Sequence, residues 1–297
     1  MRVSNRQIMD TMTKNLFRNE KRLLELQNKI SSGKRINRPS DDPLGMKRVL
    51  DYRKLLAQIK QYKKNIAYGE TWLKDTESVL GSVSDLLRRA KEIAVYQATG
   101  TSTAQTREIA AQEVKNLYDQ IIQLANSKWK GNFIFAGYQT KTNLPPFSRD
   151  EDYNATYQGD TGKIEVIVGE GNKVTINLHG QEVFSQEVDI FLTLKELKES
   201  LENNDPEMIG SLVEEIDKAF NQIDRYRAEV GARINRLESA ENYWNNFNLN
   251  IEKALSDTED ADLTEVMTDL LSQQAVYQAS LATTARIIQP SLIDFLR

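Results

Sequence analysis

The chain has 297 residues and a formal net charge of −4, with acidic and basic residues interspersed along it. This length can hold two domains and a sizeable core, while the mixed charges argue against nucleic acid as a partner and the short apolar runs against membrane insertion. The absence of cysteine excludes disulfides and thiolate chemistry.

The N-terminal stretch predicts an amphipathic helix with a partner-facing seam. Large apolar residues recur every seven positions, and two more fill the offset positions of the same stripe: Met9, Leu16, Leu23 and Ile30, with Met12 and Leu26. A sustained apolar period of about 3.5 residues is typical of coiled coils. Because chain termini are normally the least ordered part of a domain, such a seam at the very start indicates assembly.

The segment between Gly33 and Gly45 predicts a bend followed by a new helix. Gly33 can end the first helix in the left-handed conformation. Asp42 followed by Pro43 is a good N-cap and first-turn pair. Asp41 and Asp42 could in principle form a metal or acid–base pair, but their place before Pro43 favours helix capping.

Two long stretches, one in each half of the chain, carry apolar seams of equal length. The first lies in a helix expected from Pro43 to about Thr99, and its seam repeats every seven residues: Ile59, Ile66, Leu73, Leu80, Leu87 and Ala94. The second repeats in the same way: Ile216, Ile223, Val230, Leu237, Trp244 and Ile251. We expect these helices to pack side by side in one rod, with a shorter helix over 105–128.

The segment between the two halves predicts a small β-rich insertion. Apolar residues alternate with polar ones on both sides of a glycine-containing turn: Ile164, Val166 and Val168, then Val174, Ile176 and Leu178. A period of two on both arms predicts a β-hairpin. A third strand is predicted over 153–157 and a short helix over 192–201. An isolated sheet of this size is marginally stable without help from neighbours.

The C-terminal stretch carries a second terminal seam. Its apolar residues interleave at spacings of three and four: Leu263, Met267, Leu270, Tyr277, Leu281, Ile288 and Phe295. Ordering a whole terminal segment costs more conformational entropy than one such seam returns by burial. We therefore expect both ends to be disordered in the monomer and to fold on assembly. The alternative is an intramolecular hairpin that completes the bundle.

No motif for catalysis, phosphate binding or metal binding stands out. Gly169 and Gly171 resemble half of a dinucleotide fingerprint, but strands flank them on both sides, which favours a hairpin turn. His179 has no second histidine or cysteine to complete a metal site, which favours a turn or surface role. The acidic residues before the last helix lack the spacing of a calcium loop, and we expect capping and a solvated loop there: Asp257, Glu259, Asp260 and Asp262. We expect no cofactor, no metal and no enzyme.

Four sequence motifs carry a resemblance to a known family. They are the opening Met1-Arg2-Val3-Ser4, the run 32–37 with Pro39 and Asp41-Asp42-Pro43, the stretch 132–137, and the ending 291–296. With these motifs the chain resembles the flagellin superfamily, and within it the proteins at the junction of hook and filament. Flagellins usually have Asp-Asp-Ala where this chain has Asp42-Pro43, and they usually end on a different leucine-rich tail. The resemblance covers residues 1–137 and 192–297.

The seams and the resemblance together predict a mainly α fold with a β-rich insertion: an elongated rod of long helices built from both halves of the chain, with terminal coiled-coil segments. The expected divisions are an N-terminal assembly segment over 1–45, the two halves of the rod over 46–137 and 192–255, the insertion over 138–191 and a C-terminal assembly segment over 256–297.

The resemblance implies a structural subunit that joins hook to filament. Its implied partners are other copies of itself, the first hook-associated protein, flagellin, an export chaperone and the flagellar type III export apparatus. It implies an extracellular, flagellar location reached without a cleaved signal peptide. This suits the first residues of the chain, which lack the apolar region of an ordinary secretory signal peptide.

The expected assembly interface consists of seam positions at both ends: Leu16, Leu23, Leu26, Ile30, Leu270, Tyr277, Leu281, Ile288, Phe295 and Leu296. The bend between terminal coil and rod is expected to be shaped by a second set: Arg35, Asn37, Asp41, Asp42 and Pro43. For each residue the alternative is ordinary intramolecular packing or capping.

Three other functions stay open. A short flagellin would build the filament itself. An enzyme with its site in the insertion would need histidine and acids clustered in 138–190, where His179 is the sole histidine. An unrelated intracellular coiled-coil adaptor would have stable helical termini in the monomer.

Overall fold

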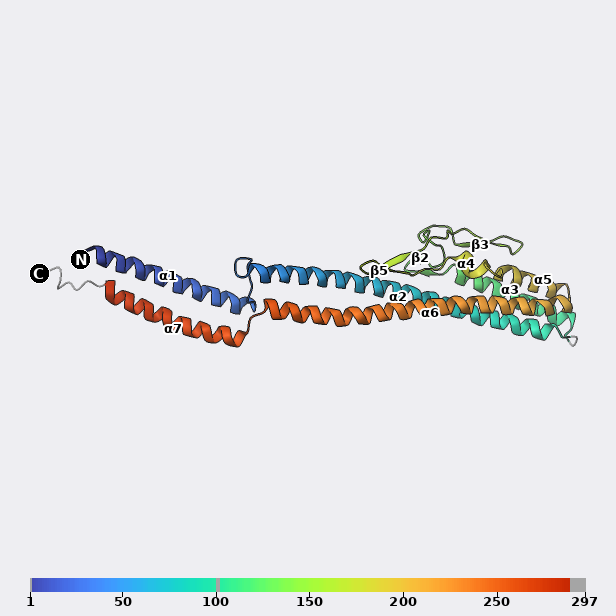
Figure 1. The fold of residues 1–297 in the computed structure, drawn as a ribbon. Coiled ribbons are helices and arrows are strands. Elements are labelled where there is room, and N and C mark those ends of the chain that lie inside the picture. The colour runs from blue at the N-terminus through green and yellow to red at the C-terminus, as the bar shows by residue number, and fades with distance from the viewer. Residues whose placement is uncertain (1, 100–101, 289–297) are drawn as a thin grey trace. The chain divides into compact units, whose positions relative to one another are not determined.

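The computed structural model describes residues 2–99 and 102–288, and it is mainly helical with a small β region, as predicted (Figure 1). Its contacts divide the chain into two compact units. The terminal unit combines both chain ends, Met1–Gln58 and Asn246–Arg297, and the central unit is continuous, Ile59–Asn245. Two long helices contribute to both units, because α2 spans Pro43–Gln97 and α6 spans Pro206–Glu259.

In the central unit α2 and α6 pack against each other, as their equal seams predict. All six α2 seam residues from Ile59 to Ala94 are buried, and so are the α6 seam residues from Ile216 to Leu237. Trp244 is half-buried. An ion pair also joins the two helices, with Lys91 Nζ 2.6 Å from Asp217 Oδ1. The core of the unit is therefore built from two segments that lie on either side of the insertion.

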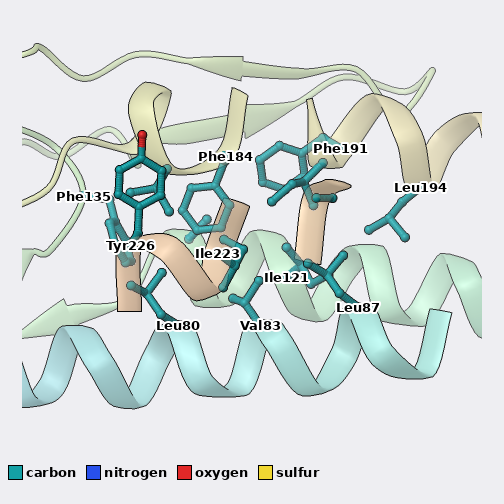
Figure 2. Close-up of a cluster of buried hydrophobic side chains, with 14 of the residues drawn as sticks. Leu80, Val83, Leu87, Ile121, Phe135, Phe184, Phe191, Leu194, Ile223 and Tyr226 are labelled. Atoms are coloured by element: carbon teal, nitrogen blue, oxygen red, sulfur yellow. The ribbon is translucent and has the colours of Figure 1, made fainter. Parts of the chain in front are cut away.

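Two shorter helices cover this pair and close the core. α3 (Ala104–Ala125) packs along α5 (Ile190–Glu202), which includes the helix predicted over 192–201. In Figure 2, Leu80, Val83 and Leu87 of α2 lie beneath Ile121 and Ile223. Three aromatic rings pack beside and above these aliphatic side chains. Those rings are Phe135, Phe184 and Phe191.

The end of α2 is held by a buried cation from α3. Arg107 is 4% exposed, and its guanidinium donates to the carbonyls of Gln97 and Thr99 at 3.0 Å each. It also donates to Asn204 Oδ1 at 2.6 Å. A cation at a helix C-terminus satisfies carbonyls that have no partner within the helix and complements the helix dipole.

The described residues contain three two-stranded antiparallel sheets. β5 (Glu165–Gly169) and β6 (Asn172–Thr175) form the predicted hairpin, with Val166 opposite Val174. β4 (Ala155–Tyr157) lies within the third predicted strand, but it pairs with β3 (Phe147–Arg149) and not with the hairpin. The pattern does not predict β3, or β1 (Lys128–Trp129) and β2 (Asn132–Phe133), because two or three residues are too short to show an alternation.

The marginal hairpin is stabilised by side chains of the long helices, which bond to its backbone. Asn65 of α2 donates to the carbonyl of Ile167 at 2.8 Å, and Arg233 of α6 donates at 3.0 Å to the carbonyl of Asn177, two residues after β6. Gly69 lets the hairpin approach α2, because a Cβ there would lie 2.9 Å from the Ile176 side chain. The helices therefore supply the support that a two-stranded sheet lacks on its own.

Candidate assembly surface at the chain ends

The terminal unit is built around α1 (Arg2–Ser32) and α7 (Leu263–Ile288), which pack along each other. Half-buried side chains recur on both helices at spacings of three and four, as in a coiled coil. On α1 they include Met12, Leu16, Asn19, Leu23, Leu26 and Ile30, and on α7 Val266, Leu270, Gln273, Tyr277, Ser280 and Thr284. Among the side chains described on these two helices, none is buried.

The α7 face that meets α1 is more polar than the predicted seam. Asn19 donates from Nδ2 to Ser280 Oγ at 3.0 Å, and Gln273 Nε2 lies 3.4 Å from Asn19 Oδ1. A polar residue inside a seam needs such partners. Ser280 and Gln273 supply them for Asn19, so the face of α7 that carries these two residues is the one that meets α1. Leu263 and Met267 lie outside this face, because they are 53% and 51% exposed in the single chain.

The terminal pair leaves large apolar side chains uncovered. Phe17 and Leu24 on α1 are 64% and 51% exposed, and Leu271 on α7 is 62% exposed. Apolar side chains that gather on an exposed surface mark an interaction site. The pair therefore has a half-buried inner seam and, on its outward surface, further large apolar side chains from both helices.

The structure distributes the predicted interface residues over both surfaces. Six lie on the inner seam: Leu16, Leu23, Leu26, Ile30, Leu270 and Tyr277. Leu281 lies outside it and is 41% exposed. The side chain of Ile288, and the residues Phe295 and Leu296, lie outside the described part of the structure.

The bend between α1 and α2 is a chain of caps. Gly33 has a left-handed φ of 70°, which glycine adopts without a steric penalty. The Asp41 carboxylate accepts the backbone N–H groups of Arg38 at 2.8 Å and Asn37 at 3.0 Å, and these bonds lower the pKa of Asp41. Asp42 Oδ1 accepts the N–H of Gly45 at 2.9 Å, at the start of α2 next to Pro43.

The acidic residues before α7 include one, Glu259 at the end of α6, whose surroundings differ from the expected solvated loop. Asp262 caps α7 through the N–H of Thr264 at 2.9 Å, in line with the expected capping. Glu259, however, is only 5% exposed, and its carboxylate lies 2.6 Å from Lys34 Nζ and also accepts a bond from Arg53. The prediction of a solvated loop is therefore wrong for Glu259. No local pattern signals this burial, because both cations lie in the other end of the chain.

The remaining candidate groups carry no evident chemistry. Within the described residues, no three histidine, cysteine or acidic side chains gather where a metal ion could bind. His179 is a helix cap and not a plain turn residue: its Nδ1 accepts the N–H of Glu182 at 3.2 Å at the start of α4 (Gly180–Ser185). Its Nε2 lies 2.9 Å from Glu182 Oε2. No helix in the described part of the chain has the length and apolar character to cross a membrane.

Comparison with known proteins identifies the family. Residues 3–140 match the bacterial flagellin N-terminal helical region, and residues 213–296 match the bacterial flagellin C-terminal helical region. The chain belongs to the bacterial flagellin family. The two matches include nearly all of α1 and the whole of α7, and they leave out most of the insertion and α5. The resemblance stated from the motifs is thereby confirmed.

Relatives within the family match almost the whole chain. Flagellar hook-associated protein 3 of Salmonella typhimurium is 27% identical and covers 100% of both chains. The protein of the same name from Escherichia coli is 26% identical over 94% of this chain and 95% of its own. Among solved structures, a putative flagellar hook-associated protein from Vibrio parahaemolyticus is 25% identical with a TM-score of 0.68, covering 74% of this chain and 100% of its own.

Proposed function

We propose that this chain is a structural subunit of the bacterial flagellum that joins the hook to the filament. The observation that carries the proposal is the match over full length to proteins named flagellar hook-associated protein 3. A structural role also suits the central unit, whose large buried side chains form a hydrophobic core.

The terminal pair supplies the contacts between subunits. With no buried side chain described on α1 or α7, the pair gains little from its own seam. Phe17, Leu24, Leu271 and Leu281 offer apolar surface that neighbouring subunits can cover. We therefore propose that the terminal helices become stable only when other subunits pack on them, and that the interface extends through Ile288, Phe295 and Leu296.

The partners follow from a place between hook and filament. They are other copies of the chain, the first hook-associated protein on the hook side and flagellin on the filament side. Transit through the flagellar type III export apparatus, with an export chaperone beforehand, requires an unfolded chain, which poorly buried ends favour. The proposal also keeps the expected boundaries between the assembly segments and the rod, at residues 45 and 255.

A polymerisation assay separates this function from that of a short flagellin. Purified chain is added to hook ends that already carry the first hook-associated protein, and separately to flagellin seeds. A junction subunit adds to the hook ends in a limited amount and then allows flagellin to extend from them. If the chain alone elongates seeds into long filaments, it is a flagellin, and if it adds to neither end, the junction role is wrong.

A further inference from the structure

The last residue of α6 holds the segment after α1 through its backbone. The carbonyl of Glu259 accepts the N–H of Arg35 at 2.7 Å, and the N–H of Ala261 donates to the carbonyl of Gly33 at 3.0 Å. Lys34 and Asp260 form an antiparallel bridge between these bonds. Two segments from opposite ends of the chain are thus paired at this joint.

The side chain of Glu259 holds the same segment by charge. Its carboxylate is 6% exposed, whereas the Lys34 and Arg53 side chains that bind it are 37% and 45% exposed. A buried carboxylate is tolerated only when it is paired and hydrogen-bonded. Lys34 and Arg53 therefore lose a shared partner when this one carboxylate is removed.

Other charges around the joint are engaged separately. The guanidinium of Arg35 donates to the carbonyl of Thr258 at 2.7 Å, near the end of α6, and lies 3.9 Å from Asp42 Oδ2. Asp260 accepts the hydroxyl of Ser256 at 2.6 Å, within its own turn. Glu259 is therefore the carboxylate that joins Lys34 and Arg53.

The joint also contains the buried apolar side chains of the terminal unit. Among its described residues, Ile36 and Val49 are 2% and 1% exposed, whereas nothing described on α1 or α7 is buried. Gly45 packs so closely that a Cβ would lie 2.5 Å from Ile36 Cδ1. The strongest packing of the unit is therefore at the joint, where the two ends meet.

We propose that Glu259 is a latch that makes the two chain ends become ordered together. With the carboxylate engaged, segment 33–42 is fixed on the turn between α6 and α7, so that α1 leaves the joint beside α7. Without it, only the backbone bonds and the Arg35–Thr258 bond join the two segments, and the joint opens more often. The latch deepens the proposed function, because it ties the presentation of α1 to the presence of α7. It is a property of a single chain, however, and it can fail while the flagellar role stands.

Hydrogen exchange on the full soluble chain tests the latch. The measurement is made in trimethylamine N-oxide, which favours the folded state, and it follows the amides of Arg35 and Ala261, one on each side of the joint. In the unchanged chain we expect both amides to be protected and to open in one step, with equal dependence on added urea. Glu259→Gln is expected to speed the exchange of both by at least about tenfold.

Matched variants separate the latch from a general effect of lost charge. Glu252→Gln removes an exposed carboxylate from the same helix, where Glu252 accepts a bond only from Asn248 in the described contacts, and it should change neither amide. Lys34→Gln should speed both amides, and combining it with Glu259→Gln should add little, because the two act through one interaction. The latch is wrong if the unchanged chain protects neither amide, if Glu259→Gln affects only one of them, or if it behaves like Glu252→Gln.

Discussion

The indole N–H of Trp244 donates to the carbonyl of Val168 at 2.6 Å, which joins the α6 seam to the β5–β6 hairpin. The Trp244 ring also packs on Tyr62 of α2, with ring centroids 5.1 Å apart. One side chain therefore links the hairpin to both long helices within the central unit.

Trp244→Phe should keep most of the ring packing and lose the hydrogen bond. We expect the free energy of unfolding of the central unit to fall by about 1–2 kcal/mol, because the carbonyl of Val168 loses its donor. Urea unfolding followed by circular dichroism measures the change. Tyr96→Phe, which alters a ring 68% exposed at the end of α2, is the control and should change the midpoint little. Equal midpoints for the two variants would mean that the bond contributes nothing.

Gln222 is a buried amide that bonds both to α4 and to the connection between α4 and α5. Its Oε1 accepts the N–H groups of Glu187 and Val188 at 3.0 Å each, and its Nε2 donates to the carbonyl of Val183 at 2.9 Å. Gln222→Leu would leave these three backbone groups without that partner, at about 1–3 kcal/mol for each one that stays buried. We expect a loss of about 3 kcal/mol or more in urea unfolding.

Gln120→Leu is the matched control for this substitution, since Gln120 is exposed on α3. An exposed change of this kind should stay within about 0.5 kcal/mol. If Gln222→Leu costs no more than the control, water or a rearranged loop replaces the amide, and the bonds do not hold the connection in place.

Tyr157 makes the central unit sensitive to alkaline pH. Burial raises the pKa of its hydroxyl from 10.0 to about 12, and the hydroxyl donates to the carbonyls of Phe135 and Asp160 at 2.9 Å each. The pKa of this hydroxyl is higher in the folded state than in the unfolded chain. The stability that the hydroxyl contributes is therefore fully present below pH 10 and is lost as the pH rises towards 12.

Tyr157→Phe should therefore be less stable than the unchanged chain near neutral pH, by about 1 kcal/mol. The gap should narrow as the pH rises from 10 towards 12. Urea midpoints of both chains across this range measure it. A gap that stays constant or widens would show that the hydroxyl does not titrate differently in the folded and unfolded chains.

The sequence predicts those parts of the fold that repeat with the helical period. The α2 seam from Ile59 to Ala94 is predicted because an apolar residue at every seventh position has one structural solution, burial against a partner helix. The hairpin is predicted for the same reason with a period of two. β3 is not, because its outer edge is set by Asn126, whose side chain bonds to both the N–H and the carbonyl of Phe147 at 2.8 Å.

The candidate site is less predictable, because its contacts join opposite ends of the chain. The apolar pattern of α7 is wider than one stripe, so it cannot say which face meets α1, and the polar contact of Asn19 with Ser280 selects that face. Glu259 lies among other acids at the end of α6, and only the approach of Lys34 and Arg53 distinguishes it from them. Long-range partners of single polar residues leave no period in a sequence.

Leu281→Asp tests whether the outward surface of the terminal pair is the assembly interface. Leu281 is 41% exposed in the single chain, so a charge there stays in water and should leave the circular dichroism and urea midpoint of the soluble chain unchanged. In an assembled subunit the same charge would be buried against apolar neighbours, at a cost of several kcal/mol. We expect addition to hook ends, counted by electron microscopy, to be abolished.

Leu144→Asp makes the same chemical change at a leucine 67% exposed in the central unit, and a chain with it should add to hook ends normally. If Leu281→Asp also assembles normally, the outward surface of α7 is not an interface. If Leu281→Asp instead unfolds the soluble chain, Leu281 is part of the intramolecular packing, because a charge can destabilise a monomer to this extent only where the monomer itself buries the side chain.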